Sequence, residues 1–394
     1  MRRYDTSIKT ILQEKNRYLQ ETGASPVFLS DWDSDYNSIR MPSLNYHNIC
    51  LSDVQKYYFW TDEEGYRDTV QTFLYSQFSL STCKDEFTIG SNGTSSIMLA
   101  LTALKETGNH RALVLTPVYF STLNMLDALN FDVVEIRLSD KNNFKIDTEQ
   151  IDKIIISESL DTLIVTNPFF GCGTELDLDT INRIVDVCNK HDVCLVMDYI
   201  YGGMSWKMDK QDYYIFNCPI YNAVRRTNHY VFIESISKRV FLNGAKFALV
   251  FASSFLMRRI LRLSVFMVGS MAYQQVSLVP QIYSDSSIQS LSSLILDNSQ
   301  IAQSRYRMIQ TMLLDTHITL SKADCGYFAL LSIPNKLHID DTLFAISILN
   351  KTGVLTTPHS RYLYKENGLY SFRINLLLDQ KIIIDGISKI RNLK

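Results

Sequence analysis

The chain has 394 residues, 46% of them apolar and 20% charged, which is typical of a globular protein with a large core. Its formal net charge of −2 gives no electrostatic reason to expect nucleic acid or an acidic membrane surface as a partner. The seven cysteines are odd in number and irregularly spaced, which favours reduced thiols over a disulfide framework or a zinc site.

Residues 1–50 are predicted to form an N-terminal segment that contributes to a smaller domain. The polar start, Met1 to Asp5, lacks the apolar stretch of a signal peptide, so we expect a cytoplasmic protein. An amphipathic helix is expected from Ile8 to Leu19, followed by irregular chain. Aspartates at positions 31, 33 and 35 lack the glycine and glutamate of a calcium loop, which favours an ordinary solvated loop.

Strand and helix patterns alternate from about residue 85 to 251. Several of the apolar runs are continuous, which is typical of strands buried on both faces. Helical spacing of apolar residues separates them, as from Ile97 to Leu104 and from Ile181 to Cys188, the latter with Asp177 or Asp179 as its cap. This alternation predicts an α/β fold with a mostly parallel sheet and helices on both faces. The expected strands are 87–89, 112–116, 133–136, 162–166, 193–197, 230–233 and 247–251.

The pattern changes after residue 255. The apolar stretch from Phe255 to Val276 is interrupted by three arginines, at 258, 259 and 262, so it is not expected to span a membrane. A long helix with a break is predicted over 284–316, then strands at 327–331 and 370–375 and helices at 341–350 and the C-terminus. We therefore divide the chain into the N-terminal segment, a large domain over 51–283, and a linker helix with a small α+β domain over 284–394.

Ligands of open α/β sheets lie beyond the carboxyl ends of the strands, so the residues that follow each strand are candidates for a site. The turn Gly90–Ser96, which includes Gly93 and Thr94, precedes a helix and offers backbone N–H groups and hydroxyls to a phosphate, although an ordinary capped turn explains it equally well. Tyr119 follows the next strand and suits either stacking on a flat ligand or core packing.

Charged residues follow two further strands. Asp198 ends an apolar strand, where a carboxylate is costly to bury without a cationic partner, and Tyr201 lies three residues on. Lys238 follows the strand 230–233, and a desolvated lysine amine has a lowered pKa and can attack a carbonyl. Taken alone, Ser235-Ile236-Ser237-Lys238 is more typical of a surface turn after a strand. Near the C-terminus, the guanidinium of Arg373 suits a carboxylate.

Together these residues describe a site for pyridoxal phosphate and an amino acid, and the chain resembles the fold-type I pyridoxal-phosphate enzymes of the class I/II aminotransferase family over about residues 55–390. The resemblance implies that Lys238 forms the aldimine with the cofactor and carries a proton, that Asp198 keeps the pyridine nitrogen protonated, and that Tyr201 bonds the phenolic oxygen. It implies phosphate contacts and a stacking ring from further residues, a contact of Arg373 with the substrate carboxylate, and a homodimer in which Tyr57 or Tyr58 reaches the neighbouring site. The phosphate and ring contacts fall on Gly93, Thr94, Tyr119, Ser235, Ser237 and Lys246.

The chain departs from the family pattern at three places. Lys246 stands where the family has an arginine, so a point charge replaces a bidentate fork. Phe170 stands at the family's asparagine that bonds the phenolic oxygen, and Asn167 would take over that bond only with a shifted loop. Tyr199 replaces the usual glutamate after the aspartate, which we consider a minor change.

The first functional hypothesis is transamination between an L-amino acid and a 2-oxo acid. The second is other pyridoxal chemistry on a specialised amino acid, as in a lyase, a cyclase or an oxygen-using oxidase or hydroxylase, because Phe170 and Lys246 change the surroundings of the lysine. The third is a non-catalytic binding protein, which the presence of the lysine disfavours. The sequence does not identify the amino acid. Candidate specificity residues are Trp32, Tyr36, Phe59 and Trp60.

Overall fold

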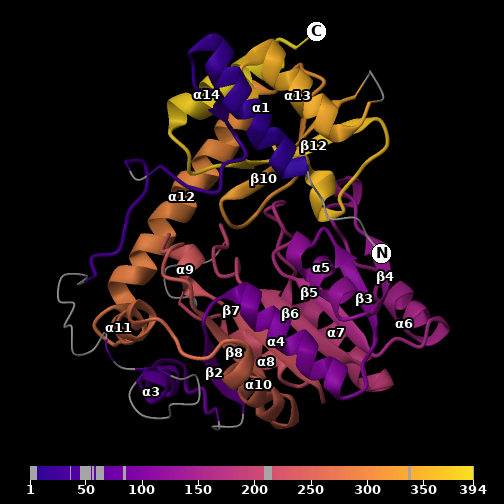
Figure 1. The fold of residues 1–394 in the computed structure, drawn as a ribbon, viewed down its shortest axis with the longest axis vertical. Helices are drawn as coiled ribbons and strands as arrows, with labels where there is room; N and C mark the ends of the chain where they lie inside the picture. Colours follow the sequence, from indigo (N-terminus) through magenta and orange to yellow (C-terminus); the bar gives the residue numbers. More distant parts are fainter. Residues whose placement is uncertain are drawn as a thin grey trace.

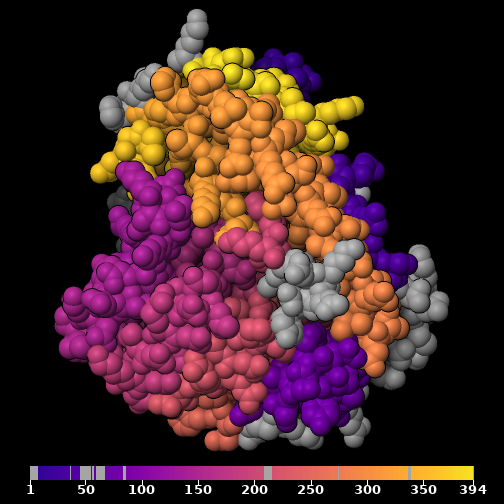
Figure 2. Space-filling model, turned by 180° about the vertical axis from the view of Figure 1, so that it is seen from behind, coloured from indigo at the N-terminus to yellow at the C-terminus, as the bar shows by residue number. Residues whose placement is uncertain are grey.

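The computed structural model describes residues 7–35, 37–44, 55, 57–58, 66–82, 86–207, 215–335 and 339–393. A seven-stranded sheet and its helices form the lower part of Figure 1, and two smaller sheets with their helices form the upper part. Seen from behind, the C-terminal residues rest directly on the residues of the large sheet region (Figure 2). The predicted division into domains stays a prediction.

The large sheet has the strand order β2-β8-β7-β6-β5-β3-β4. All neighbours pair in parallel except β8, which runs antiparallel to both β2 and β7. The predicted α/β class with a mostly parallel sheet is therefore confirmed. All seven expected strands are present: β2 (Phe87–Gly90), β3 (Arg111–Thr116), β4 (Asp132–Arg137), β5 (Thr162–Thr166), β6 (Cys194–Tyr199), β7 (Tyr230–Glu234) and β8 (Ala248–Ala252).

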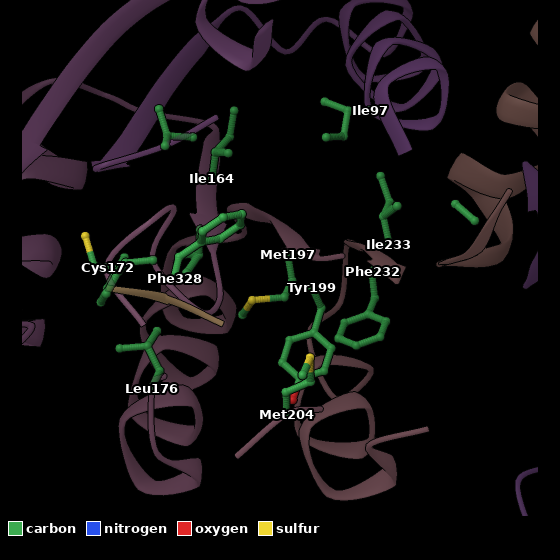
Figure 3. Packing of buried hydrophobic residues seen from close by; sticks show 14 of the residues in the cluster. Ile97, Ile164, Cys172, Leu176, Met197, Tyr199, Met204, Phe232, Ile233 and Phe328 are labelled. Carbon is green, nitrogen blue, oxygen red and sulfur yellow. The ribbon is translucent and has the colours of Figure 1, made fainter. Parts of the chain in front are cut away.

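The central strands are buried on both faces because helices cover each side. In Figure 3, Ile233 of β7 points toward Ile97 on one side of the strands, and Phe232 points toward Tyr199 and Met204 on the other. Two groups of helices pack among themselves, one of α4, α5 and α10 and one of α6, α7 and α8. Their bounds are α4 (Gly93–Glu106), α5 (Phe120–Ala128), α6 (Thr148–Ser157), α7 (Leu178–His191), α8 (Cys218–Val224) and α10 (Ser254–Met267).

The upper part is built around β10 (Phe328–Pro334), which pairs antiparallel with β12 (Leu369–Asn375) and with β9 (Thr319–Leu320). The N-terminal segment joins it, because β1 (Val27–Phe28) pairs in parallel with β11 (Val354–Leu355). Helix α1 (Ser7–Thr22), predicted from its apolar spacing, packs on α13 (Asp341–Thr352), and α14 (Gln380–Arg391) packs against β1. Residues far apart in the sequence thus hold this region together.

Helix α12 (Ile288–Met312) runs from the large sheet region to the upper part (Figure 1). The prediction of a broken helix here is wrong, since α12 is continuous and the irregular turn precedes it. The serines at its start do not interrupt it, because the Ser290 hydroxyl donates to the Ser287 carbonyl and stays within the helix. Helices α11 (Tyr273–Ile282) and α3 (Tyr66–Phe78) pack together beside its lower end. Within the ranges described above, no helix has the length and apolarity to cross a bilayer.

Candidate active site

A cavity of about 550 Å³ lies at the carboxyl ends of the central strands. The register explains why side chains from separate strands meet here, since Asp198 at the end of β6 pairs with Thr166 of β5 and with Ile233 of β7. Nine of the predicted site residues line the cavity. These are Gly93, Thr94, Tyr119, Asp198, Tyr201, Ser235, Ser237, Lys238 and Lys246.

Lys238 belongs to the short helix α9 (Ile236–Arg239), which begins one residue after the Ser235 that follows β7. Its Nζ donates a hydrogen bond to Oδ1 of Asn243 over 3.0 Å and lies 5.6 Å from the centre of the Tyr201 ring. Burial and, secondarily, the neighbouring charge of Lys246 lower the pKa of Lys238 to about 8. At neutral pH a substantial fraction of this amine is therefore uncharged and nucleophilic.

Asp198 is 7% exposed, and burial raises the pKa of its carboxyl to about 6. The backbone N–H of Ile200 donates to its Oδ1 over 3.2 Å. Among the described residues, no lysine, arginine or histidine forms an ion pair with this carboxylate. A buried carboxylate without a cationic side chain is costly, so the site suits a ligand that brings a positively charged N–H group.

The start of α4 and the turn after β7 form an anion-binding end of the cavity. Asn92 caps α4 by accepting the N–H of Ser95, while the first-turn N–H groups have no partner within the helix. A Cβ at Gly93 would lie 2.1 Å from Cδ1 of Ile200, so a larger residue would require the Ile200 side chain to move. Hydroxyl groups of Ser235 and Ser237 lie 2.6 Å apart. Because the Ser235 hydroxyl donates to the Phe247 carbonyl over 2.6 Å, the groups that can donate to a phosphate here are the first-turn N–H groups of α4, the Ser237 hydroxyl and the Lys246 side chain.

Four of the five aromatic side chains in the described lining of the cavity are called the aromatic wall: Trp32, Tyr119, Phe170 and Tyr201. Phe170 lies at its centre, with ring centroids 5.4 Å from Tyr119, 5.7 Å from Trp32 and 5.9 Å from Tyr201. Phe170 offers no hydrogen-bond donor to a ligand, in keeping with the departure seen in the sequence. Tyr201 is partly buried, and burial raises the pKa of its hydroxyl, which keeps it a hydrogen-bond donor.

Arg373 lies in β12 and does not line the cavity directly. Its guanidinium carbon is 3.4 Å from the centre of the Trp32 ring, and Nη2 donates to the Ser30 carbonyl over 3.0 Å. The Nε and Nη1 groups are buried and bond to no other described residue. Burial lowers the pKa of this arginine, yet a guanidinium stays charged. The unpaired donors suit a carboxylate that reaches past Trp32.

Asn167 lies apart from the cavity lining. Its side-chain oxygen accepts the backbone N–H of Leu176 over 2.8 Å, and its Nδ2 has no partner among the described residues. This bond ties the loop after β5 to the chain before α7. The shifted loop that would bring Asn167 to the cofactor is not seen, and the assignment of Asn167 to cofactor binding stays a prediction.

Several lining residues were not singled out from the sequence. Asn92 and Asn243 were missed, although each lies within five residues of a predicted site residue. Asp33 was interpreted only as part of a solvated loop. Of the proposed specificity residues, Trp32 lines the cavity, whereas Tyr36, Phe59 and Trp60 lie outside the described residues.

The two tyrosines proposed for a neighbouring subunit lie outside the cavity of this chain. Tyr57 is 79% exposed. Tyr58 packs toward Tyr273 with a ring-centroid distance of 6.3 Å.

An α/β fold with a lysine of lowered pKa, an unpaired buried carboxylate, an anion-binding helix start and a stacking aromatic ring defines a pyridoxal-phosphate site of fold type I. The chain belongs to the family described as aminotransferase class I and II, whose model matches residues 62–385. Enzymes of this family depend on pyridoxal phosphate, so the cofactor and the enzyme class expected from the residues are confirmed at the level of the family.

Curated relatives are distant. 1-Aminocyclopropane-1-carboxylate synthase 2 of Cucurbita pepo is 22% identical over 259 residues, which cover 60% of this chain and 49% of that protein. Valine–pyruvate aminotransferase of Mycobacterium tuberculosis is 24% identical over 178 residues, covering 45% of this chain and 43% of that protein. The chain thus spans about half the length of these relatives.

Solved structures match over the whole fold. A double mutant of Thermus thermophilus aspartate aminotransferase has a TM-score of 0.79 at 14% identity and covers 99% of both chains. Escherichia coli YbdL, whose structure is described together with a methionine aminotransferase function, has a TM-score of 0.75 at 14% identity and covers 98% of this chain and 97% of its own. At these identities the likeness shows the fold alone.

Proposed function

We propose that the protein is a pyridoxal-phosphate-dependent aminotransferase that moves an amino group between an L-amino acid and a 2-oxo acid. The observation that carries this proposal is the placement of Lys238, with a pKa of about 8, in one cavity with the unpaired buried carboxylate of Asp198. When bound, pyridoxal phosphate supplies an aldehyde that condenses with amines and a ring that withdraws electrons from bonds at the substrate Cα.

The residues of the chain bind the cofactor and carry the proton. Lys238 would hold the cofactor through Nζ, and its amine would carry a proton from the substrate Cα to C4′ of the cofactor, the transfer that moves the amino group. Asp198 keeps a proton on the ring nitrogen, since its own buried charge is stabilised by a cationic N–H group. The first turn of α4, Ser237 and Lys246 bind the phosphate, and Tyr119 stacks on the ring.

Arg373 is proposed to bind the α-carboxylate of the substrate. Its Nε and Nη1 groups are available for this contact, and a guanidinium forms two parallel hydrogen bonds with a carboxylate. The face of the guanidinium is covered by Trp32, which excludes water from the charge. This arrangement would orient the Cα substituents toward Lys238.

We also propose a cytoplasmic homodimer with shared sites. The support is the high exposure of Tyr57, which leaves its ring accessible to a second copy of the chain. Five cysteines of the described part are free and buried, which fits a reducing compartment. Size-exclusion chromatography with light scattering tests the dimer, and a monomeric holoenzyme with full activity would refute the sharing of sites.

The test of the function compares wild type with Lys238→Ala and with Lys153→Ala, an exposed lysine of α6 that serves as the matched control. After borohydride treatment in the presence of pyridoxal phosphate, wild type and Lys153→Ala should carry covalently attached cofactor, and Lys238→Ala should not. With amino-acid and 2-oxo-acid panels, wild type should convert both members of a pair. A protein that binds no cofactor would overturn the proposal.

A second candidate, other pyridoxal chemistry on a specialised amino acid, is favoured by one observation. Phe170 presents an apolar ring where an amide donor would bond the phenolic oxygen of the cofactor, and this changes how the ring is polarised. The test measures ammonia release and oxygen consumption in the absence of a 2-oxo acid, in air and under anaerobic conditions. Turnover in this assay would favour the second candidate over transamination. Stoichiometric formation of a new amino acid from the 2-oxo acid would exclude it.

A further inference from the structure

We propose that the substrate of this site is an amino acid whose side chain ends in a positive charge, and that Asp33 recognises this charge. The inference rests on the proposed function and narrows it to a class of substrate. It follows from the charges that line the cavity and from the fixed position of Asp33 relative to Arg373.

Four charged side chains line the cavity: Asp33, Asp198, Lys238 and Lys246. The proposed function assigns the last three to the cofactor, as the partner of the ring nitrogen, the covalent anchor and a phosphate contact. Asp33 has no such task. Its carboxylate forms no hydrogen bond or ion pair with another described residue, and it lies at the solvent-exposed mouth of the cavity.

The segment that carries Asp33 is anchored to β12 through its backbone. Nδ2 of Asn375 donates to the carbonyls of Asp31 and Asp33 over 3.3 and 3.2 Å, and Nη2 of Arg373 donates to the carbonyl of Ser30. These bonds hold Trp32 and Asp33 at a defined place beside the guanidinium. When the α-carboxylate of a substrate binds Arg373, its side chain can therefore extend past Trp32 toward Asp33 along one rim of the cavity.

The charges in the cavity favour a substrate side chain with a positive charge. Arg373 offsets the α-carboxylate, and Lys246 with the start of α4 offsets the phosphate, which leaves the charge of Asp33 uncompensated. A cationic side-chain terminus removes this imbalance, whereas an anionic one adds repulsion. The field of Asp33 reaches the reacting amine as well, since it acts on Lys238.

The test uses arginine and citrulline, which have nearly the same shape and differ in the charge of the terminal group. We expect kcat/KM for arginine to exceed that for citrulline by about tenfold or more, the effect of one partly exposed charge pair. Asp33→Asn should remove most of this ratio. The ratio, and not either rate alone, is the readout, because the charge of Asp33 also raises the pKa of Lys238 and its loss affects both substrates alike. Asp35→Asn, on the same segment but outside the lining, is the matched control and should keep the ratio.

A binding measurement separates recognition from turnover. Calorimetry with Lys238→Ala loaded with pyridoxal phosphate should give tighter binding for arginine than for citrulline, and the difference should shrink as salt is added. Equal or better use of citrulline, or a preference for glutamate, would overturn the inference and leave the proposed function standing. If no amino acid is converted or bound, the proposed function fails and the inference fails with it.

Discussion

Replacing Lys246 with methionine should raise the pKa of Lys238 and slow the attachment of pyridoxal phosphate at neutral pH. The pKa of Lys238 is lowered to about 8 by burial first and by the charge of Lys246 second. At pH 7 about one tenth of an amine with that pKa is neutral, compared with about one in 2,500 for an unperturbed lysine of pKa near 10.4. At pH 7 the surroundings of Lys238 thus increase the neutral, reactive fraction of its amine about 250-fold over that of an unperturbed lysine.

Burial persists in Lys246→Met, so only the part of the shift due to the neighbouring charge is lost. A like charge in a partly buried site shifts a pKa by about 0.5 to 1 unit, which predicts an attachment rate about three- to tenfold lower at pH 7 and unchanged above pH 10. The sign follows from the charged form: removing a positive neighbour stabilises the ammonium of Lys238, and the ammonium does not attack an aldehyde.

The assay follows the growth of the visible absorption band by stopped flow from pH 6.5 to 10. Pyridoxal without its phosphate is used beside pyridoxal phosphate, because Lys246 is also a proposed phosphate contact and pyridoxal removes that effect. An exposed-lysine variant, Lys153→Met, is the matched control, and a short lysine peptide corrects for titration of the aldehyde ring. A wild-type rate that still rises tenfold per pH unit above pH 9.5, or identical midpoints in wild type and Lys246→Met, would refute the reasoning.

Three further predictions concern residues around the cavity. Arg373→Met should raise KM for the amino acid by about thirtyfold or more, because the carboxylate loses charge-assisted hydrogen bonds, and an unchanged KM in initial-rate measurements would contradict the assignment. Phe170→Ala should lower the free energy of unfolding in urea by about 3 to 5 kcal/mol, since the ring is 3% exposed and packs on four other aromatic rings. A loss below about 1 kcal/mol would contradict this prediction, because it would show that the aromatic wall repacks to fill the space left by the ring. His359 is buried, and burial lowers the pKa of its ring to about 3. Below pH 6.5 the unfolded chain therefore binds a proton at His359 that the folded chain does not bind, so the free energy of unfolding decreases as the pH is lowered. Urea unfolding at pH 7 and pH 5 should show about 2 kcal/mol of extra acid destabilisation in wild type relative to His359→Gln, and equal losses in both would contradict the burial of a neutral ring.

The sequence predicted the large sheet and one end of the cavity because the relevant signals are local. Continuous apolar runs mark each central strand, and the residue after a strand in a parallel sheet must lie at its carboxyl edge. Asp198 and Lys238 follow β6 and β7, which are neighbours in the sheet, so their meeting needs no further information. The glycine and hydroxyl residues at the start of α4 lie at the same edge for the same reason.

The other end of the cavity was not predictable because its residues meet only through tertiary contacts. Trp32 reaches Arg373 because the two-residue strand β1 pairs with β11, and pairings this short leave no periodic pattern in the sequence. The burial of Arg373 behind Trp32 likewise depends on a partner more than 340 positions away, the carbonyl of Ser30. Asp33 becomes part of the cavity lining through the same anchoring, although its sequence context is that of a solvated loop.

The departure at Phe170 is one part of a coupled arrangement. Gly171 has φ of +73°, and a Cβ there would lie 2.6 Å from Cε1 of His359, so the loop needs glycine beside that ring. Nε2 of His359 in turn lies 3.7 Å from Sγ of Cys172, and this Sγ lies 3.5 Å from the Phe170 carbonyl oxygen. Asparagine at position 170 would therefore enter a loop whose backbone is still held by these contacts. We therefore expect Phe170→Asn alone to add a buried amide without giving it a bond to the cofactor.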